Sequence, residues 1–461
     1  MVVEEIDLRL RPLELLGRLS GEPGLAYVQG IAGPGGRRFT VLGCAPRATV
    51  EIHAGGTVVG IPPGCAPERA DPLAALDAFL AALPRPPSSS PFPVRDAAIG
   101  YLAYDLRTAI ERVPARAPDD IGLPLAIFCW YDPLLIHDDT NRRYYLASTS
   151  SRGAVRDRRA LLLDRLTTNT ASPPAAETGR PLATAFRSNM TLEGYRAAVG
   201  RIHDYIVAGD VYQINLAQRF SACLTTDPLA LFAHLTRHHP MPLSAYFDAG
   251  RFQILSNSPE LFLERHGTRI ATQPIKGTRR RGWTRDEDAR LRRELLTDPK
   301  ERAEHVMIVD LERNDLGRIC QLGTVRVREF ARVHSYPTLH HMVSIVEGEI
   351  EPDLPVPEIV RATFPGGSIT GAPKIRAMEI IDALEPNARG IYTGALGIID
   401  GAGDMHMSLP IRTAITAAET LYYGSGGGIV ADSDADAEYE ESLLKAEAIL
   451  SALGVRPENS T

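Results

Sequence analysis

Apolar and polar residues alternate along several short segments, which predicts β-strands that each bury one face. Two of these segments, Ala48–His53 and Thr57–Ile61, flank Gly55-Gly56 and predict a β-hairpin. The other predicted strands are Ala126–Tyr131, Arg143–Thr149, Val211–Phe220, Gln253–Arg265 with a break at Ser258-Pro259, Arg269–Lys276, and Leu409–Ile415.

Apolar residues spaced three and four positions apart predict amphipathic helices elsewhere. One helix is expected from Asp71-Pro72 to Leu83, with Asp71 as the N-cap and proline in the first turn. A second helix is expected to begin at Thr191 and to end at Gly209. Its apolar face is formed by Tyr195, Val199, Ile202 and Ile206.

One segment departs from both patterns. Thr168–Asn189 has little apolar periodicity and contains Ser172-Pro173-Pro174-Ala175-Ala176, which is typical of a mobile connection. It separates an N-terminal region, residues 1–167, from a C-terminal region, residues 190–453, and residues 454–461 form a short tail.

The composition is that of a globular protein. The 461 residues are 44% hydrophobic and 23% charged, and the net charge of −7 gives no footprint for nucleic acid or an anionic membrane. The five cysteines lack metal-site or disulfide spacing and are expected to be reduced thiols. No signal sequence or membrane-spanning run is evident, so we expect a soluble, cytoplasmic protein.

Lys276 is the first candidate for chemistry. Pro274 restricts the backbone before it and Gly277 permits an unusual path after it, so the amine is held in a defined place. Two interpretations are open for such a lysine. It is either a solvated surface charge, which is the commoner case, or a buried nucleophile with a lowered pKa.

Carboxylates recur in pairs on two predicted helices. Glu301 and Glu304 follow Asp298-Pro299, and Glu438 and Glu441 lie near the C-terminus on the same face as Lys445. Each pair taken alone is explained by helix capping or by a solvated face. Four carboxylates that converge on one pocket would instead require a hard cation, for which Mg²⁺ is the usual choice.

Glycine-rich segments supply candidates for anion binding. Gly424–Gly428 follows an apolar strand, and its backbone N–H groups can cradle a carboxylate, although a flexible hairpin turn is the commoner outcome. Arg412 can grip a carboxylate with two hydrogen bonds. His341 lies beside apolar residues and, on its own, is more typical of a core histidine. Walker and G-x-S-x-G motifs are absent from these loops.

Several long motifs in a defined order give a sharper indication. They are Gly100–Asp105, Pro299–His305, Val309–Arg318, Phe364–Lys374 and Glu438–Glu441. Together they resemble the chorismate-utilising enzymes, the family of anthranilate, aminodeoxychorismate, isochorismate and salicylate synthases. The resemblance implies an α+β fold: a large two-lobed body of antiparallel β-sheets packed in a sandwich and flanked by helices. It also implies an N-terminal lobe of the anthranilate synthase component I type (1–167), a linker (168–189), a chorismate-binding catalytic domain (190–453) and a tail (454–461).

The resemblance implies a role for each candidate residue. Glu304 and Glu441 are expected to be the nearest Mg²⁺ ligands, with Glu301 and Glu438 completing an acidic cage through water. Glu260 is expected to protonate the departing 4-hydroxyl, with His341 beside the substrate ring. The implied substrate contacts are Gln213, Ser368, Tyr392, Arg412, Gly426, Gly427, Gly428 and Lys445.

Two positions distinguish the reactions of the family. Isochorismate and salicylate synthases place a water-activating lysine where this chain has Gln213. Anthranilate synthases generally have alanine where this chain has Lys276, whereas aminodeoxychorismate synthases have lysine. A neutral lysine amine can attack ring carbon 2 as the 4-hydroxyl leaves. Ammonia then adds at carbon 4 and expels the lysine. We therefore expect aminodeoxychorismate synthase component I, which serves the synthesis of 4-aminobenzoate and folate.

This expectation has two alternatives and implies partners. In the first alternative the chain is anthranilate synthase component I and Lys276 is a bystander; in the second it is a catalytically silent chorismate-binding paralogue. Ammonia is expected from a separate glutamine amidotransferase subunit, and a separate aminodeoxychorismate lyase is expected to complete 4-aminobenzoate.

Overall fold

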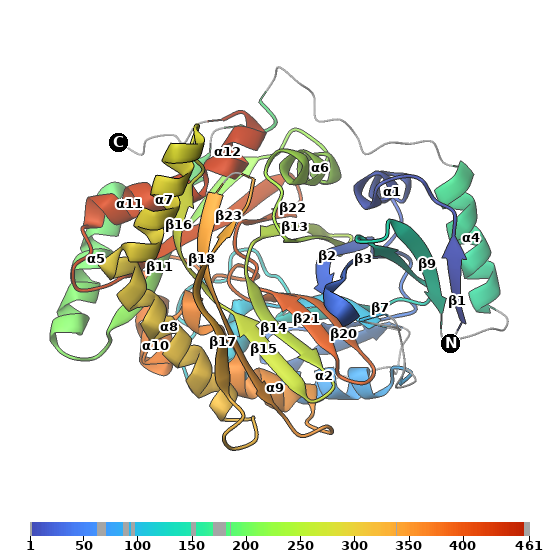
Figure 1. Ribbon diagram of the computed structural model, residues 1–461, viewed down its shortest axis with the longest axis horizontal. Coiled ribbons are helices and arrows are strands. Elements are labelled where there is room, and N and C mark those ends of the chain that lie inside the picture. Colours follow the sequence, from blue (N-terminus) through green and yellow to red (C-terminus); the bar gives the residue numbers. More distant parts are fainter. Residues whose placement is uncertain are drawn as a thin grey trace.

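Two large antiparallel sheets packed face to face between helices organise the described part of the chain (Figure 1). The computed structural model describes residues 2–61, 71–85, 92–93, 97–148, 154–168, 181–184, 186–337 and 339–455. The expected α+β fold of packed antiparallel sheets flanked by helices is confirmed. The middle of the expected linker and most of the expected tail lie outside the described residues.

The first sheet, sheet A, has 12 strands among the described residues, and the second, sheet B, has 11. In spatial order sheet A contains β1 (Val2–Ile6), β9 (Arg143–Ser148), β8 (Leu134–Asp138), β3 (Arg38–Gly43), β2 (Ala26–Ala32), β12 (Leu243–Asp248), β13 (Phe252–Ser258), β22 (Thr413–Ala417), β23 (Thr420–Ile429), β11 (Gln213–Cys223) and β10 (Arg187–Ser188), with β19 (Gly371–Ala372) also paired to β11. Sheet B contains β16 (Ile275–Arg280), β18 (Leu339–Glu349), β15 (Arg269–Gln273), β14 (Leu261–His266), β21 (Met405–Ser408), β20 (Ala395–Asp400), β6 (Ala97–Leu102), β7 (Ala126–Trp130), β4 (Ala48–Ile52) and β5 (Val58–Ile61), with β17 (Arg326–Ser335) paired to β18.

The helices cover the outer faces and ends of the sheets. They are α1 (Pro12–Arg18), α2 (Pro72–Ala81), α3 (Arg107–Ile110), α4 (Ala154–Thr168), α5 (Leu192–Val207), α6 (Pro228–His238), α7 (Arg285–Thr297), α8 (Pro299–Gly317), α9 (Val356–Thr363), α10 (Lys374–Leu384), α11 (Ala435–Lys445) and α12 (Glu447–Leu453). Short 3₁₀ helices occur at η1 (Pro34–Gly36), η2 (Ala54–Gly56), η3 (Tyr104–Leu106) and η4 (Gly367–Ile369). None of the described helices has the length and apolar character needed to cross a membrane.

Apolar side chains from both sheets form the central layer. Ile31 and Val41 of sheet A belong to the same buried cluster as Ile99 and Ile127 of sheet B. Burial of a large aliphatic side chain stabilises the fold by about 1.5–3 kcal/mol, so this layer holds the sheets together. On the outer faces, α1, α6 and α12 pack against sheet A, and α2, α8 and α9 pack against sheet B.

The N-terminal and C-terminal regions contribute strands to both sheets. In sheet A, β2 pairs with β12, so Tyr27 lies opposite Tyr246. In sheet B, β6 pairs with β20, so Gly100 lies opposite Gly397. The backbone hydrogen bonds of these pairs connect segments that are far apart in the sequence.

Elements with clear local signals form as expected. The hairpin is β4–β5, and the break at Ser258-Pro259 separates β13 from β14. Asp71 caps α2 by accepting hydrogen bonds from Leu73 N and Ala74 N. Thr191 caps α5 through Gly194 N.

Three elements differ from the expectation. The strand predicted over Arg269–Lys276 is interrupted at Pro274, so Lys276 lies at the start of β16 and not at the end of β15. The segment from Leu409 becomes a strand only at Thr413, because Arg412 adopts a positive φ of 51°. Gly424–Gly428 is neither an anion-binding loop nor a turn, since it lies within β23 and pairs with β11.

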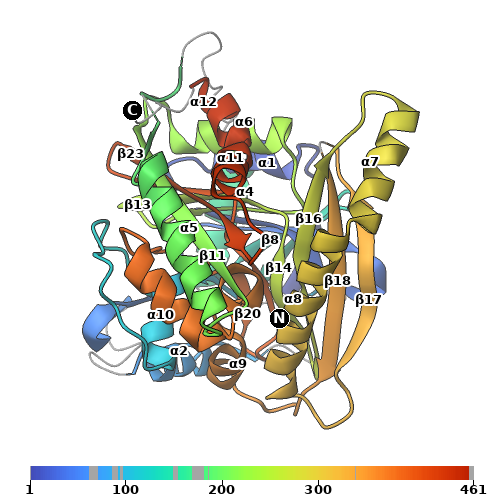
Figure 2. The same cartoon turned by 90° about the vertical axis from the view of Figure 1, so that its left-hand side faces the viewer.

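The candidate residues gather where sheet B approaches β11 and β23 of sheet A. Helices α7 and α8 lie against β16, β17 and β18 (Figure 2). On the other side of this region, α11 contacts β23 and α5. The carboxylate pairs of α8 and α11 thus reach the same region from two elements far apart in the sequence.

Candidate active site

Lys276 is enclosed and faces sheet A. Its side chain is 17% exposed. A Cβ atom added to Gly428 of β23 would lie 2.6 Å from Lys276 Nζ and 2.8 Å from Gln213 Nε2. The lysine therefore touches the β11–β23 pair where glycine leaves room for it, and the surface interpretation of this residue is wrong.

The charge state of Lys276 differs from the expectation. Nζ lies 2.7 Å from Glu304 Oε2 on α8. Burial lowers the pKa of Lys276, but Glu304, Glu441 and Glu301 outweigh burial and leave the pKa raised. The lowered pKa expected for a neutral nucleophile is therefore wrong for this structure, in which the lysine is an ammonium ion.

Gln213 places an amide without a protein partner beside this lysine. Its side chain is fully buried, and neither Oε1 nor Nε2 has a hydrogen-bond partner among the described residues. Asn215 Oδ1, two residues further along β11, is in the same state. Because buried polar atoms without partners are unfavourable by about 1–3 kcal/mol each, such groups mark a place where a ligand completes the hydrogen bonding.

Glu260 lies in the turn between β13 and β14 and titrates near neutrality. Ser368 Oγ donates a hydrogen bond of 2.7 Å to Glu260 Oε1. Burial raises the pKa of Glu260 to about 7, against smaller lowering contributions from Ser368, the Ile275 N–H group and Lys276. A carboxyl group with this pKa can be a proton donor at neutral pH.

His341 is neutral in this structure. Its side chain is buried in β18, and Nδ1 lies 3.0 Å from Thr278 Oγ1. Burial, assisted by the nearby charge of Arg412, lowers the pKa of His341 to about 3. Nε2 has no hydrogen-bond partner among the described residues and is free to bind a ligand.

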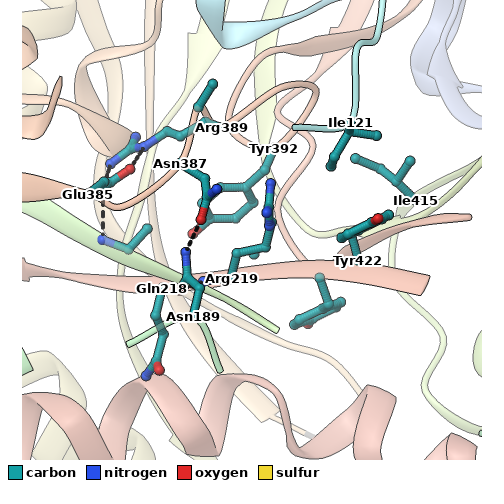
Figure 3. A pocket seen from close by; sticks show the side chains of 14 residues that line it. Ile121, Asn189, Gln218, Arg219, Glu385, Asn387, Arg389, Tyr392, Ile415 and Tyr422 are labelled. Carbon is teal, nitrogen blue, oxygen red and sulfur yellow. Dashed lines mark hydrogen bonds and ion pairs between the residues drawn. The ribbon is translucent and has the colours of Figure 1, made fainter. Parts of the chain in front are cut away.

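Arg412 and Tyr392 lie near Tyr423 and Gly424 of β23. Arg412 and Tyr423 line one pocket, in which no described residue forms a hydrogen bond or ion pair with the guanidinium group. Tyr392 lines another pocket (Figure 3). Its ring packs on Gly424, where an added Cβ would lie only 2.4 Å away.

The glycines of β23 have no side chains, so neighbouring side chains can pack directly on the strand backbone. Gly426 lies opposite Ala217 and Gly427 lies opposite Leu216 in the sheet register. The carbonyl of Gly426 accepts a hydrogen bond of 2.9 Å from Lys445 Nζ. We infer that these glycines serve close side-chain packing on a strand, which explains why the expected anion-binding loop is not formed.

Each of the four candidate metal-binding glutamates is paired with a cationic side chain. The pairs are Glu301–Arg279 at 2.9 Å, Glu304–Lys276 at 2.7 Å, Glu438–Lys300 at 3.5 Å and Glu441–Lys445 at 2.8 Å. Within the described residues, no three His, Cys, Asp or Glu side chains form a group able to hold a metal ion. Glu304, Glu301 and Glu441 all act on Lys276, so carboxylates of α8 and α11 share one region and each is also ion-paired with a cation.

The donor chemistry nevertheless fits Mg²⁺. Magnesium binds protein through one or two carboxylates and keeps several waters, so it does not require a cage of three or more. A Cβ added to Gly427 would lie 3.2 Å from Glu438 Oε2 and 3.9 Å from Glu441 Oε1. The missing side chain therefore leaves space beside two carboxylates of α11.

The candidate residues fall into contact groups. Lys276 and Gln213 both approach Gly428, Lys276 is ion-paired with Glu304, and Glu260 accepts a hydrogen bond from Ser368. His341 contacts Thr278, Tyr392 lies beside Arg389, and Arg412 lines a pocket with Tyr423. Gly426, Glu438, Glu441 and Lys445 surround Gly427, and Glu301 lies beside Gly277.

The structure adds two groups that the sequence analysis missed. Glu312 of α8 accepts a hydrogen bond from Gly367 N, next to Ser368, and burial raises its pKa to about 8. Arg389 and Glu385 form a buried ion pair beside Tyr392 (Figure 3). The three-residue spacing of Glu312 and Asp315 on α8 is a signal for the first group, whereas only the fold brings the second to the site.

Known proteins share the sequence motifs and the fold of this chain. The profile of the family described as chorismate binding enzyme matches residues 32–451. The chain belongs to this family. It is 37% identical over 430 residues to aminodeoxychorismate synthase component 1 of Bacillus subtilis, covering 92% of this chain and 91% of the relative. It is 40% identical over 417 residues to anthranilate synthase component 1 of Thermus thermophilus, covering 90% and 89% of the two chains.

A solved structure supports the same assignment. Anthranilate synthase component I from Streptococcus pneumoniae superposes with a TM-score of 0.79 at 30% identity, covering 91% of this chain and 93% of its own. The family and the resemblance in the motifs are therefore confirmed, and the chain is a chorismate-utilising enzyme. Relatives with both names are similarly close, so the choice between the two reactions depends on the site itself.

Proposed function

We propose that this chain is component 1 of aminodeoxychorismate synthase, which converts chorismate and ammonia to 4-amino-4-deoxychorismate. The observation that carries the proposal is the enclosed position of Lys276 against Gly428, the glycine that Gln213 also approaches. Within the described residues, the ion-pair partner of this amine is Glu304, a carboxylate of the same candidate site. Anthranilate formation needs no such amine.

In the proposed reaction Glu260 donates its proton to the departing 4-hydroxyl, which leaves as water. The Lys276 amine forms a bond to ring carbon 2, and the ring double bonds shift as the bond between carbon 4 and the departing oxygen breaks. Ammonia then adds at carbon 4, the bond to Lys276 breaks, and the amine is restored. Lys276 must lose a proton before it attacks, so its ion pair with Glu304 has to weaken when substrate binds.

The remaining residues bind and orient the substrate. Arg412 and Lys445 supply positive charge for carboxylates, with Tyr392 and the backbone of Gly426, Gly427 and Gly428 beside them. Gln213 and His341 offer the buried polar atoms that lack protein partners. A neutral glutamine cannot activate water, which disfavours hydration at carbon 2.

We further propose Mg²⁺ as the cofactor. Glu304 and Glu441 would be its nearest ligands, with Glu301 and Glu438 acting through water. When bound, the ion would neutralise these carboxylates and hold the carboxylate on the chorismate ring. The paired carboxylates of α8 and α11 support this assignment.

The component 1 names of the relatives support a partner that delivers ammonia. We propose a glutamine amidotransferase subunit in this role, and a separate lyase that converts the product to 4-aminobenzoate.

Product analysis tests the proposal. The purified chain is incubated with chorismate, Mg²⁺ and ammonium, and the products are separated by chromatography with and without an added aminodeoxychorismate lyase. We expect aminodeoxychorismate, which the lyase converts to 4-aminobenzoate. Anthranilate as the main product would favour the alternative reaction, and no turnover would favour a silent paralogue.

A further inference from the structure

A buried ion pair stands beside the site without contacting the predicted substrate groups other than Tyr392. Arg389 Nη2 lies 2.6 Å from Glu385 Oε1, and Nε lies 2.9 Å from Oε2, so the pair is bidentate. The two side chains are 3% and 5% exposed. Figure 3 shows them facing each other next to Tyr392, with Glu385 also bonded to the backbone of β11.

This pair occupies a gap on the edge of β11. On this edge β19 pairs with Gln213 and Ile214, and β10 pairs only with Phe220 and Ser221. Between them, Arg389 Nη2 donates a hydrogen bond of 2.7 Å to the carbonyl of Asn215, and Ala217 N donates one of 2.9 Å to Glu385 Oε1. The two side chains thus make the hydrogen bonds that a neighbouring strand would make.

The same guanidinium group also reaches the segment of Ser368, the hydrogen-bond partner of the proposed general acid Glu260. Arg389 Nη1 donates 2.9 Å to the carbonyl of Ile369, which directly follows Ser368. The carbonyl of Thr370 accepts a hydrogen bond of 2.8 Å from Asn215 N. The Arg389 Cζ atom lies 6.0 Å from the centre of the Tyr392 ring. One planar group with several fixed donors therefore connects β11, the Ser368 loop and Tyr392.

A merely stabilising role explains this arrangement poorly. Buried ion pairs are often no more stabilising than apolar side chains of similar volume, because both charges must leave water. What the pair provides is geometry, since its bonds to Asn215 and Ala217 end on the strand of Gln213 and its bond to Ile369 ends next to Ser368. Arg389 Nη1 also donates a hydrogen bond of 3.3 Å to Thr393 Oγ1.

We propose that Arg389, held by Glu385, is a positioning residue that fixes the Ser368 loop and the strand of Gln213 relative to one another for catalysis. The proposal rests on the proposed function for the identity of the reaction, but not for its test. A lysine at this position keeps the charge but cannot bond Glu385, Asn215 and Ile369 together in one plane.

The test compares Arg389→Lys with a matched variant, Arg265→Lys. Arg265 of β14 is 2% exposed and donates to three backbone carbonyls, those of Gly267, Pro352 and Leu354, whereas Arg389 donates to two. None of these carbonyls borders a candidate residue, so this variant reports the effect of losing a buried arginine alone. Glu385→Gln, which keeps an acceptor for Ala217 N, serves as a second variant if Arg389→Lys does not fold.

Chorismate consumption with ammonium is measured across pH, and hydrogen exchange of the backbone amides is measured by mass spectrometry without substrate. In Arg389→Lys we expect kcat to fall by about 10- to 100-fold, as for a misplacement of reacting groups by about 1 Å. We expect Arg265→Lys to retain the parent kcat when the two variants have comparable melting temperatures. The amides of Asn215, Ala217 and Thr370 should exchange faster in Arg389→Lys only.

The pH profile adds a readout that general destabilisation does not produce. The Ser368 hydrogen bond lowers the pKa of Glu260, and the other charged groups that act on this carboxyl are Lys276 and Glu312. A displaced Ser368 loop should therefore move the alkaline limb of kcat to higher pH, in the same direction as Ser368→Ala.

The proposal is overturned if both arginine variants lose activity in proportion to their loss of stability, or if the three amides exchange as in the parent. Anthranilate as the product would refute the proposed function and leave this comparison valid, because consumption of chorismate is followed. If the parent consumes no chorismate, the proposal is judged on whether the three amides exchange faster in Arg389→Lys than in the parent.

Discussion

Lys276 Nζ and Glu304 Oε2 lie 2.7 Å apart, and this contact sets the charge state of the residue on which the proposed reaction depends. The lysine comes from β16 of sheet B, and the glutamate from α8, which packs on that sheet. Glu304, Glu441 and Glu301 outweigh burial and raise the pKa of Lys276, so the lysine is an ammonium ion in this structure and must lose a proton before it can attack.

Replacement of Lys276 by alanine should redirect the nitrogen. Without the amine, carbon 2 is open to ammonia, so amination at carbon 4 should fall sharply and anthranilate should appear. Lys276→Arg is the control, because it keeps a positive charge beside Glu304 but forms no bond to carbon 2. Quantification of both products by chromatography checks this, and an alanine variant with the parent's products would remove Lys276 from the mechanism.

Glu260→Gln should lower kcat by about 10²- to 10⁴-fold, which is the usual contribution of a general acid. In the parent, kcat should fall as the pH rises through about 7, because the carboxyl group must be protonated to donate. The measurement is kcat against pH at saturating chorismate. A parent profile without an alkaline limb near this pH would count against Glu260 as the acid.

The same substitution should change how stability depends on pH. The pKa of Glu260 is raised from 4.5 to about 7 in the folded protein, so its favourable contribution is complete below 4.5 and is lost as the pH rises through about 7. The free energy of unfolding of Glu260→Gln, relative to the parent, should therefore rise by about 3 kcal/mol between these limits. Urea unfolding at about pH 4.5 and pH 8 measures it, and equal differences at both would refute the burial of this carboxyl.

The glycines of β23 give a graded test of the site. Gly428→Ala should abolish activity, because its Cβ would lie 2.6 Å from Lys276 Nζ, whereas the Cβ of Gly427→Ala meets its nearest atom at 3.2 Å and should be milder. Gly200→Ala in α5 is the control, with nothing within 4 Å of its Cβ. It should leave kcat unchanged and stabilise the helix by about 0.5–1 kcal/mol. Steady-state kinetics and thermal melting distinguish this order from a uniform effect.

Metal dependence should follow Glu441 of α11. Activity should disappear with a chelator and return with Mg²⁺, and Glu441→Gln should raise the Mg²⁺ concentration for half-maximal activity by at least about tenfold. Glu440→Gln, an exposed neighbour on the same helix, is the matched control. Equal Mg²⁺ requirements in the two variants would exclude Glu441 as a ligand.

Sequence reasoning was successful where the signal is local. Caps such as Asp71 and Thr191 accept hydrogen bonds from N–H groups two or three residues away, so a short segment is enough to predict the start of a helix. The contacts that define the site are different in kind. The Gly424–Gly428 run becomes a strand only because β11 pairs with it, and a glycine run alone resembles a turn.

The electrostatics of the site also lay beyond the sequence. The residues next to Lys276 in the chain include a proline and a glycine, but the raised pKa of Lys276 arises from glutamates on α8 and α11. In the same way, nothing near Arg389 in the chain indicates that it completes the edge of β11. Charges that meet only through tertiary packing are not encoded in any short segment.

The most direct test of the account is the mass of the intact protein after incubation with chorismate and Mg²⁺ in the absence of ammonia. We expect the parent to gain the mass of chorismate less one water, with the modification on Lys276 after proteolysis, and we expect addition of ammonium to remove it. Lys276→Ala should gain nothing. A parent that forms aminodeoxychorismate with ammonium, yet shows no modification of Lys276 when ammonium is withheld, would contradict the covalent role of this lysine.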